Sequence, residues 1–322
     1  MTDQSQEKLE SPGRAVAYLM MGISSGLCLD ITAKWLLQDY ALVQFVFLRS
    51  IFGIAFLLFV VRQFGGVSSL RTNRWPWHLL RTALAAAAKF GFFYGISQMP
   101  LVNALTVGFT APLMVTALSV PFLGERVGWR RWTAVAVGFV GVVVVLRPEA
   151  GALNVASLAV LGSAFAYACL AITARHLAST ESSYSLSIYV IAGPMVISAS
   201  LLPGKWVTPS LGEWGLFAFA GLASAIAWIG IVGGYRRASP ALLAPFEYTA
   251  LIGGAIAGYV IWKEVPDRWV VVGGAIIIAS GLFVVYREVG QAISSRYLRG
   301  FSAGGAAAMA RRLKKNPFNK KR

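Results

Sequence analysis

The sequence predicts an all-α integral membrane protein, a bundle of ten transmembrane helices arranged as two inverted repeats of five. Three observations support this prediction. The chain of 322 residues is 57% hydrophobic and only 13% charged, whereas soluble proteins carry about 25% charged residues. Ten apolar segments follow one another with short connections. The fourth and ninth segments both end in an acidic residue, Glu125 and Glu264.

Each segment is close to the length that one helix needs to cross the bilayer, about 20 residues. The runs are continuous and rich in Ala, Leu and Gly, whereas strands of a membrane barrel alternate in polarity at every second residue. A helix also satisfies its own backbone hydrogen bonds inside lipid. The predicted spans are 15–36, 42–61, 78–96, 101–123, 132–146, 153–172, 184–202, 214–235, 242–262 and 269–286.

The first span follows a polar stretch and no small-residue cleavage site ends it. We therefore expect this span to be retained in the protein rather than removed as a signal peptide.

The positions of the basic residues predict the orientation. If the amino terminus is cytoplasmic, nine Arg fall in the inner loops, and only five Lys or Arg fall in the outer loops. Because basic residues stay on the cytoplasmic side, we expect a protein of the inner membrane with both termini in the cytoplasm. Much of the net charge of +16 lies in the tail 288–322. Such a tail is expected to bind anionic lipid. We expect no nucleic-acid partner, because no aromatic module for stacking on bases accompanies the positive charge.

The two halves of the chain align with each other. The predicted domains are a tail (1–14), a first repeat (15–147), a second repeat (153–287) and the basic tail. Because each repeat has five spans, the two must cross the membrane in opposite directions, as in carriers that alternate access between the two sides. An offset of 139 residues pairs Gly95 with Gly234, Thr110 with Thr249, and Glu125 with Glu264.

The segments 100–125 and 240–264 carry a family resemblance. From 15 to 287 the chain resembles the EamA-type branch of the drug/metabolite transporter superfamily, which has ten helices in two EamA repeats. The motifs Pro-Phe-Glu-Tyr-Thr (245–249) and Glu-Val-Pro (264–266) are similar to the bacterial branch that contains riboflavin permeases and S-adenosylmethionine carriers.

The resemblance implies a secondary transporter that moves a small organic metabolite by alternating access, with riboflavin uptake as the leading expectation. S-adenosylmethionine transport and export of amino acids or related metabolites are the alternatives.

Charged residues inside the predicted spans are the candidate substrate-binding residues. A charge in the middle of the membrane costs about 2.5–3.5 kcal/mol on insertion scales, so such residues usually line a cavity or form pairs. We expect Asp30, Arg49, Lys89 and Glu247 to face a cavity between the repeats, where an acid could also carry a coupling proton. The alternative is that they form structural ion bridges. Arg81 lies near a span end, and we expect it to extend to the membrane surface.

Aromatic residues in the spans could stack on a planar substrate. Trp228 and Tyr248 are the preferred candidates because of their depth, although aromatic residues in membrane helices mostly pack against lipid or neighbouring helices.

Small residues and prolines are candidates for packing and gating. The GxxxG pairs allow close approach of helices, and a proline within a span favours a kink. The residues concerned are Gly91, Gly95, Gly254, Gly258, Pro112 and Pro245.

The residue inventory argues against an enzyme. The two Cys and two His residues have no metal-ligand spacing, and no phosphate-binding GxxxxGK[ST] motif occurs. The GxSxG match at 22–26 lies within an apolar helix rather than at a strand-to-helix turn. We therefore expect no catalytic residues, metal or cofactor. The expected partners are a small-molecule substrate and the lipid bilayer, and the sequence is compatible with a homodimer or a non-transporting scaffold.

Overall fold

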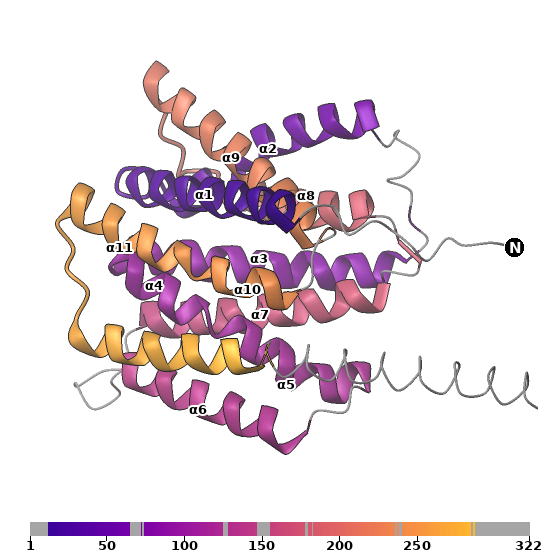
Figure 1. Cartoon of the computed structure of the whole chain (residues 1–322). Helices are drawn as coiled ribbons and strands as arrows, with labels where there is room; N and C mark the ends of the chain where they lie inside the picture. The colour runs from indigo at the N-terminus through magenta and orange to yellow at the C-terminus, as the bar shows by residue number, and fades with distance from the viewer. Residues whose placement is uncertain are drawn as a thin grey trace, which may run out of the picture.

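The structure, a computed structural model, is a bundle of helices whose axes mostly lie along one common line, with the chain running in both senses (Figure 1). It describes residues 12–64, 72, 74–124, 128–146, 155–177, 180–181, 183–235, 237, 240–284 and 286. Every regular element in these ranges is a helix and none is a strand, which confirms the all-α prediction for this part of the chain. Most of the two predicted tails, 1–14 and 288–322, lies outside the described residues, as does Glu125.

The observed helices follow the predicted spans in order. They are α1 (Pro12–Leu36), α2 (Leu42–Phe64), α3 (Trp75–Gln98), α4 (Leu101–Gly108), α5 (Ala111–Leu123), α6 (Trp129–Leu146), α7 (Val155–Leu177), α8 (Ser183–Leu201), α9 (Leu211–Tyr235), α10 (Pro240–Glu247) and α11 (Thr249–Trp262). A last apolar helix, Arg268–Val284, is drawn in yellow without a label in Figure 1.

Seven helical stretches among the described residues are long and apolar enough to cross a membrane. They correspond to α1, α2, α3, α4 with α5, α6, α7 and α9. The other three predicted spans coincide with α8, with α10 and α11 together, and with Arg268–Val284. Membrane crossing by all ten spans therefore stays a prediction.

The fourth and ninth spans are each divided into two helices close to their prolines. Pro112 stands in the first turn of α5, where its missing N–H group removes no helical hydrogen bond. Pro245 lies within α10, two residues before the end of that helix. Tyr248 separates α10 from α11 but keeps near-helical angles (φ −69°, ψ −10°). The second helix therefore continues roughly along the first (Figure 1).

Two helix pairs that the repeat relates, each joining one helix of the first half to one of the second, pack in a similar way. α1 packs on α9, and α3 packs on α7. A Cβ atom on Gly230 would lie 2.6 Å from the carbonyl oxygen of Tyr18, and one on Gly91 would lie 2.6 Å from that of Ala159. Offsets of 139 and 141 residues relate Gly91 to Gly230 and Tyr18 to Ala159. Glycine is needed at both contacts because the helix backbones approach closely.

The counterparts α1 and α7 run in opposite directions. The ends of α1 and α3 lie together, because Lys34 Nζ is 2.8 Å from the carbonyl oxygen of Met99. α3 and α7 are antiparallel, because Gly95 near the end of α3 lies against Val160 near the beginning of α7. We call the end where α1 begins the first end and the end with Lys34 the second end; they lie toward the right and left of Figure 1.

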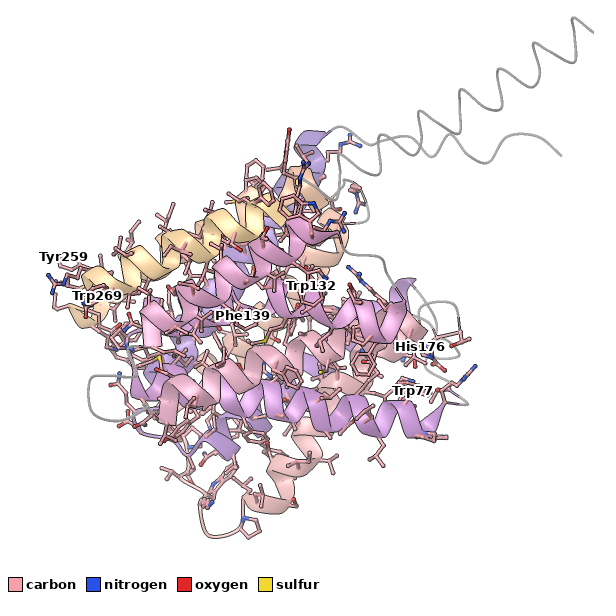
Figure 2. All side chains as sticks on the ribbon, turned by 90° about the horizontal axis from the view of Figure 1, so that it is seen from below. Trp77, Trp132, Phe139, His176, Tyr259 and Trp269 are labelled. Carbon is pink, nitrogen blue, oxygen red and sulfur yellow. The ribbon has the colours of Figure 1, made fainter. Side chains whose placement is uncertain are left out.

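A buried aromatic core joins the halves toward the second end of the bundle, where α2 begins and α3 ends. Phe45 of α2 contacts Phe93 of α3 edge to face, with ring centroids 5.1 Å apart, and lies 6.2 Å from Phe217 of α9. All three side chains are buried. Other aromatic residues gather at the ends of the bundle (Figure 2). At one end the ring centroids of Trp77 and His176 are 4.9 Å apart. Tyr259 and Trp269 lie at the opposite end. This distribution is typical of membrane interfaces.

Candidate functional site

Arg49 extends from α2 into the bundle, where it is only 3% exposed. Its Nη1 donates a hydrogen bond to Ser224 Oγ of α9 at 3.1 Å, and its guanidinium carbon lies 5.2 Å from the centre of the Phe93 ring. The buried Nε and Nη2 atoms have no hydrogen-bond partner among the described residues. A buried donor left unsatisfied is costly, so Arg49 is a candidate ligand for an anionic group.

Asp30 and Lys89 add further charges beside Arg49. Asp30 of α1 attracts Arg49, whereas Lys89 of α3 is close enough to Arg49 for their charges to repel. Asp30 and Lys89 are only partly buried although both lie deep within the bundle. The structure thus brings together three of the four predicted charged residues. We call Asp30, Arg49, Lys89 and Ser224 the mixed-charge cluster.

Lys89 also has a structural contact. Its Nζ donates a hydrogen bond to the carbonyl oxygen of Val190 in α8 at 2.9 Å. Pro194 lies four residues after Val190 within the same helix, and its missing N–H group would otherwise bind that carbonyl. Lys89 therefore compensates for the proline in α8.

Glu247, the fourth predicted charge, lies in a separate group at the end of α10. Tyr235 Oη of α9 donates a hydrogen bond to Glu247 Oε1 at 2.6 Å. Tyr167 of α7 and Tyr248 are also close enough to interact with the charge of Glu247. We call Glu247 and these three tyrosines the tyrosine–glutamate cluster.

The breaks in the two divided spans meet at the centre of the protein. Phe109 lies between α4 and α5, and Tyr248 lies between α10 and α11. Their ring centroids are 5.1 Å apart, with the ring planes tilted by 33°. The offset of 139 residues makes the two residues equivalent in the repeat. The halves therefore contact each other directly at the points where their helices are interrupted.

The remaining predicted site residues lie at helix contacts or on α9. Gly91 and Gly95 pack against α7, and Gly254 packs against Leu105 of α4. Gly258 lies beside Glu264. Trp228 lies one helical turn after Ser224 on α9 and is 42% exposed.

At the second end, an ion pair joins the two halves. Lys34 of α1 pairs with Glu264, which follows α11, and also donates to the carbonyl oxygen of Met99. Glu264 Oε2 accepts a hydrogen bond from the backbone N–H of Leu101 at 3.0 Å. The pair is therefore attached to the backbone of the connection between α3 and α4.

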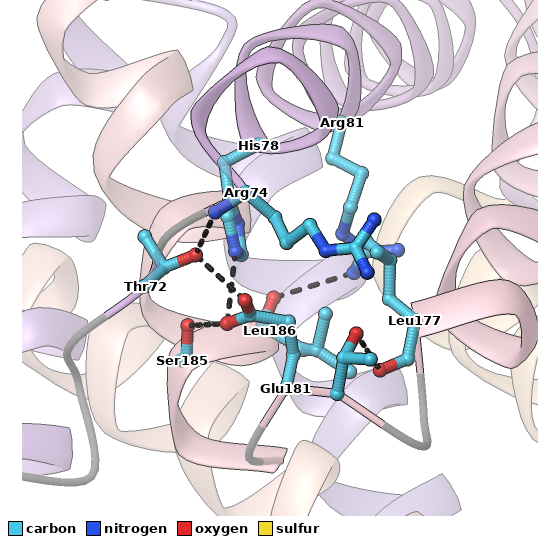
Figure 3. Close-up of polar contacts among 9 residues, drawn as sticks. Thr72, Arg74, His78, Arg81, Leu177, Glu181, Ser185 and Leu186 are labelled. Carbon is cyan, nitrogen blue, oxygen red and sulfur yellow. Dashed lines mark hydrogen bonds and ion pairs between the residues drawn. The ribbon is translucent and has the colours of Figure 1, made fainter.

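At the first end, Glu181 links α3 to α8 (Figure 3). It accepts hydrogen bonds from Thr72 Oγ1 at 2.7 Å and Ser185 Oγ at 3.0 Å, and its Oε2 lies 3.3 Å from His78 Nε2. Burial raises the pKa of Glu181, but the hydrogen bonds from Thr72, Ser185 and His78 outweigh it and hold the pKa below its usual value. The carboxylate is therefore stabilised in its ionised form.

The position of Arg81, next to this group, differs from the predicted one at the membrane surface. Its Nη1 donates to the carbonyl oxygen of Leu170 and to Thr173 Oγ1, both at 3.0 Å, and its side chain is buried. Nη2 donates to the carbonyl oxygen of Leu186 at 3.3 Å (Figure 3). The expectation that Arg81 extends to the membrane surface is wrong, because oxygen atoms of α7 and α8 replace water around its guanidinium.

Four residues of these groups are not among the site residues predicted from the sequence: Phe109, Lys34, Tyr167 and Tyr235. Phe109 had a usable signal, because the repeat offset pairs it with Tyr248. Lys34 is one of the five basic residues counted on the outer side, and the structure places it in the last turn of α1. Tyr167 and Tyr235 carry no charge, and no local pattern distinguishes them from other aromatic residues in the spans.

Comparison with known proteins identifies relatives over nearly the whole chain. The S-adenosylmethionine uptake transporter of Rickettsia bellii is 30% identical over 283 residues, which cover 88% of this chain and 97% of that protein. The riboflavin transporter of Rhizobium johnstonii is 28% identical and covers 90% of this chain and 98% of its own. The pseudopaline exporter CntI of Pseudomonas aeruginosa is 26% identical, and the aligned region covers 74% of this chain and 84% of that protein.

A solved crystal structure has the same fold, with a TM-score of 0.60 at 19% identity over 85% of this chain and 98% of its own. The EamA-like transporter family matches this chain twice, over residues 15–147 and 154–286. The resemblance seen in the sequence is confirmed, and the chain is a multi-pass membrane protein that belongs to the EamA-like transporter family.

Proposed function

We propose that this protein is a secondary transporter of the inner membrane that moves a small organic metabolite by alternating access. The observation that supports it most is the mixed-charge cluster. Three ionisable side chains from the first half meet Ser224 of the second half deep within the bundle. Elsewhere in the bundle, Phe109 and Tyr248 pack against each other where two spans are interrupted. Ionisable groups at this depth are costly unless a polar ligand or a partner uses them. Interrupted helices are a common feature of transporter binding sites.

Opposite directions of α1 and α7 support the alternating-access mechanism. Each end of the bundle carries contacts between the halves, among them Lys34 with Glu264 at the second end and His78 with Glu181 at the first end. Rocking of one half against the other would break the contacts at one end while those at the opposite end remain. From the basic loops, we assign the first end and both termini to the cytoplasm.

The charge arrangement favours a zwitterionic substrate. Arg49 has open donors for a carboxylate, and Asp30 supplies a carboxylate for an ammonium group. This favours an α-amino acid group such as that of S-adenosylmethionine, which the Rickettsia bellii relative takes up. Riboflavin, the leading expectation from the sequence, is the second candidate. The rings of Phe109 and Tyr248 offer a stacking surface for a flavin, and the Rhizobium johnstonii relative is a riboflavin transporter.

Uptake into liposomes tests this proposal. Purified protein would be reconstituted, and the entry of labelled S-adenosylmethionine and labelled riboflavin measured separately. Arg49→Gln should reduce S-adenosylmethionine uptake at least about tenfold, since the charge-assisted hydrogen bonds to the carboxylate are lost. Arg268→Gln is the matched control, because Arg268 lies over Trp269 just after the Glu264 connection at the second end.

Uptake of riboflavin alone would replace the leading substrate with the second candidate. Absence of any solute flux in both assays and in an export assay with amino acids would contradict the transporter assignment itself.

A further inference from the structure

The tyrosine–glutamate cluster is built from three separate helices of the second half. Tyr235 comes from the end of α9, Tyr167 from the middle of α7, and Glu247 with Tyr248 from the break in the ninth span. Tyr235 orients the carboxylate through its hydrogen bond to Oε1. Oε2 accepts no hydrogen bond from any residue that the structure describes. The carboxylate therefore retains a free oxygen among phenol rings.

Tyr167 indicates that accessible space borders this cluster. It lies deep in the bundle and close enough to Glu247 for their charges to interact, yet its side chain is 50% exposed. Glu247 and Tyr248 are also only partly buried. A pair that served only to hold α10 on α9 would need Tyr235 and Glu247 but would not need an exposed ring from α7.

The cluster and Arg49 lie at different depths. Arg49 is seven residues after Leu42, the first residue of α2 at the second end, which corresponds to about 10 Å along the helix. Glu247 instead contacts Tyr235, the last residue of α9, which faces the first end. A substrate bound at Arg49 could therefore place a second group beside Glu247.

We propose that Glu247, Tyr167, Tyr235 and Tyr248 bind an onium group of the substrate, that is, a sulfonium or quaternary ammonium cation. Such a cation has no N–H donor and forms no conventional hydrogen bonds. It is stabilised by a carboxylate and by the negative faces of aromatic rings. The site deepens the proposed transport function, on which it rests, by naming a second recognised group in addition to the zwitterion at the mixed-charge cluster.

Direct binding of a simple cation tests the site without transport. The probe is trimethylsulfonium, and its binding to purified protein in detergent would be followed by saturation-transfer NMR. The wild-type protein should bind it, and Glu247→Gln and Tyr167→Leu should each weaken binding at least about tenfold. Tyr167→Phe keeps the ring and should retain most of the affinity. Tyr259→Leu at the second end is the control for the loss of a tyrosine.

A second experiment links the site to the substrate. S-adenosylmethionine and S-adenosylhomocysteine differ by one methyl group and one positive charge on sulfur. Wild-type protein should bind the sulfonium at least about tenfold more tightly than the thioether, and Glu247→Gln should abolish this preference.

The outcomes separate this site from the transport proposal. Binding of trimethylsulfonium without S-adenosylmethionine uptake would contradict the proposed substrate but support the site. Failure of the wild-type protein to bind the cation, or equal binding by Glu247→Gln, would overturn the site. So would a Glu247→Gln protein that keeps the sulfonium preference but loses the pH dependence of uptake, because Glu247 would then carry a proton.

Discussion

The contacts that join the two halves differ in chemistry between the two ends of the bundle. At the second end, Lys34 and Glu264 form an ion pair whose other hydrogen bonds go to the backbone at Met99 and Leu101. At the first end, Glu181 is surrounded by side-chain groups, two hydroxyls and the His78 ring. Loss of an acid therefore leaves a nearly buried ammonium at the second end but mostly neutral groups at the first. We therefore expect the Lys34–Glu264 pair and the Glu181 group to contribute different amounts to the free energy of unfolding.

The largest effect is expected at the second end. Glu264→Gln should lower the free energy of unfolding by about 3 kcal/mol, because it leaves the charge of Lys34 unpaired in a nearly buried position. Chemical denaturation in detergent measures this change. Lys34→Met with Glu264→Gln should be more stable than Glu264→Gln alone, since the double variant has no unpaired charge. A single variant as stable as the wild type would show that the pair does not hold this end closed.

A smaller effect is expected at the first end. Glu181→Gln should lower the free energy of unfolding by about 2 kcal/mol, because an amide oxygen is a weaker acceptor for Thr72, Ser185 and His78. Unfolding measured at neutral pH gives this difference, with Asp39→Asn, an exposed acid after α1, as the control for loss of a carboxylate.

The pH dependence sharpens the comparison of the two ends. The pKa of Glu181 is lowered in the folded protein, so its contribution is present above the unfolded value of 4.5 and is lost as pH falls through the folded pKa. The difference in unfolding free energy between wild type and Glu181→Gln should therefore shrink as pH falls below about 4.5. A difference that is constant from pH 6 to pH 3, within about 0.5 kcal/mol, would contradict the assigned role of the carboxylate.

The smallest effect is expected between the ends, at Lys89. Lys89→Met should cost about 1 kcal/mol by leaving the Val190 carbonyl without a donor. Adding Pro194→Ala restores the backbone N–H that can bind this carbonyl, and it should recover much of that loss. Unfolding of the two single variants and the double variant forms a complete cycle. Additive effects of the two substitutions would show that Lys89 does not compensate for Pro194.

Sequence patterns predicted most of the helix positions, because a membrane-spanning helix needs a continuous apolar segment of a set length, which is visible in the local sequence. The observed α1, α2 and α6 lie within a few residues of predicted spans. The repeat offset also related Thr110 to Thr249, next to the two helix breaks. It did not show that the chain divides there into separate helices, because the consequence of a proline depends on its position within the helix and on the groups that replace the lost bond.

The roles of the charged residues could be predicted only in part. Depth in an apolar segment identified Asp30, Arg49, Lys89 and Glu247 as unusual. It could not show which side chains face each other, and so it did not separate Glu247 from the other three. The same reasoning failed for Arg81, since a residue near a span end can turn toward water or toward carbonyl groups of neighbouring helices.

The sequence by itself determined the all-helical class, the apolar spans, the internal repeat and the family, because each is recorded in residue type and spacing along the chain. Tertiary structure decided which residues from distant helices meet: Arg49 with Ser224, Tyr235 with Glu247, and Phe109 with Tyr248. The physical reason is that helix faces with similar apolar composition can pack in many ways. The choice among these ways depends on close backbone contacts and buried hydrogen bonds, which form only when the whole bundle assembles.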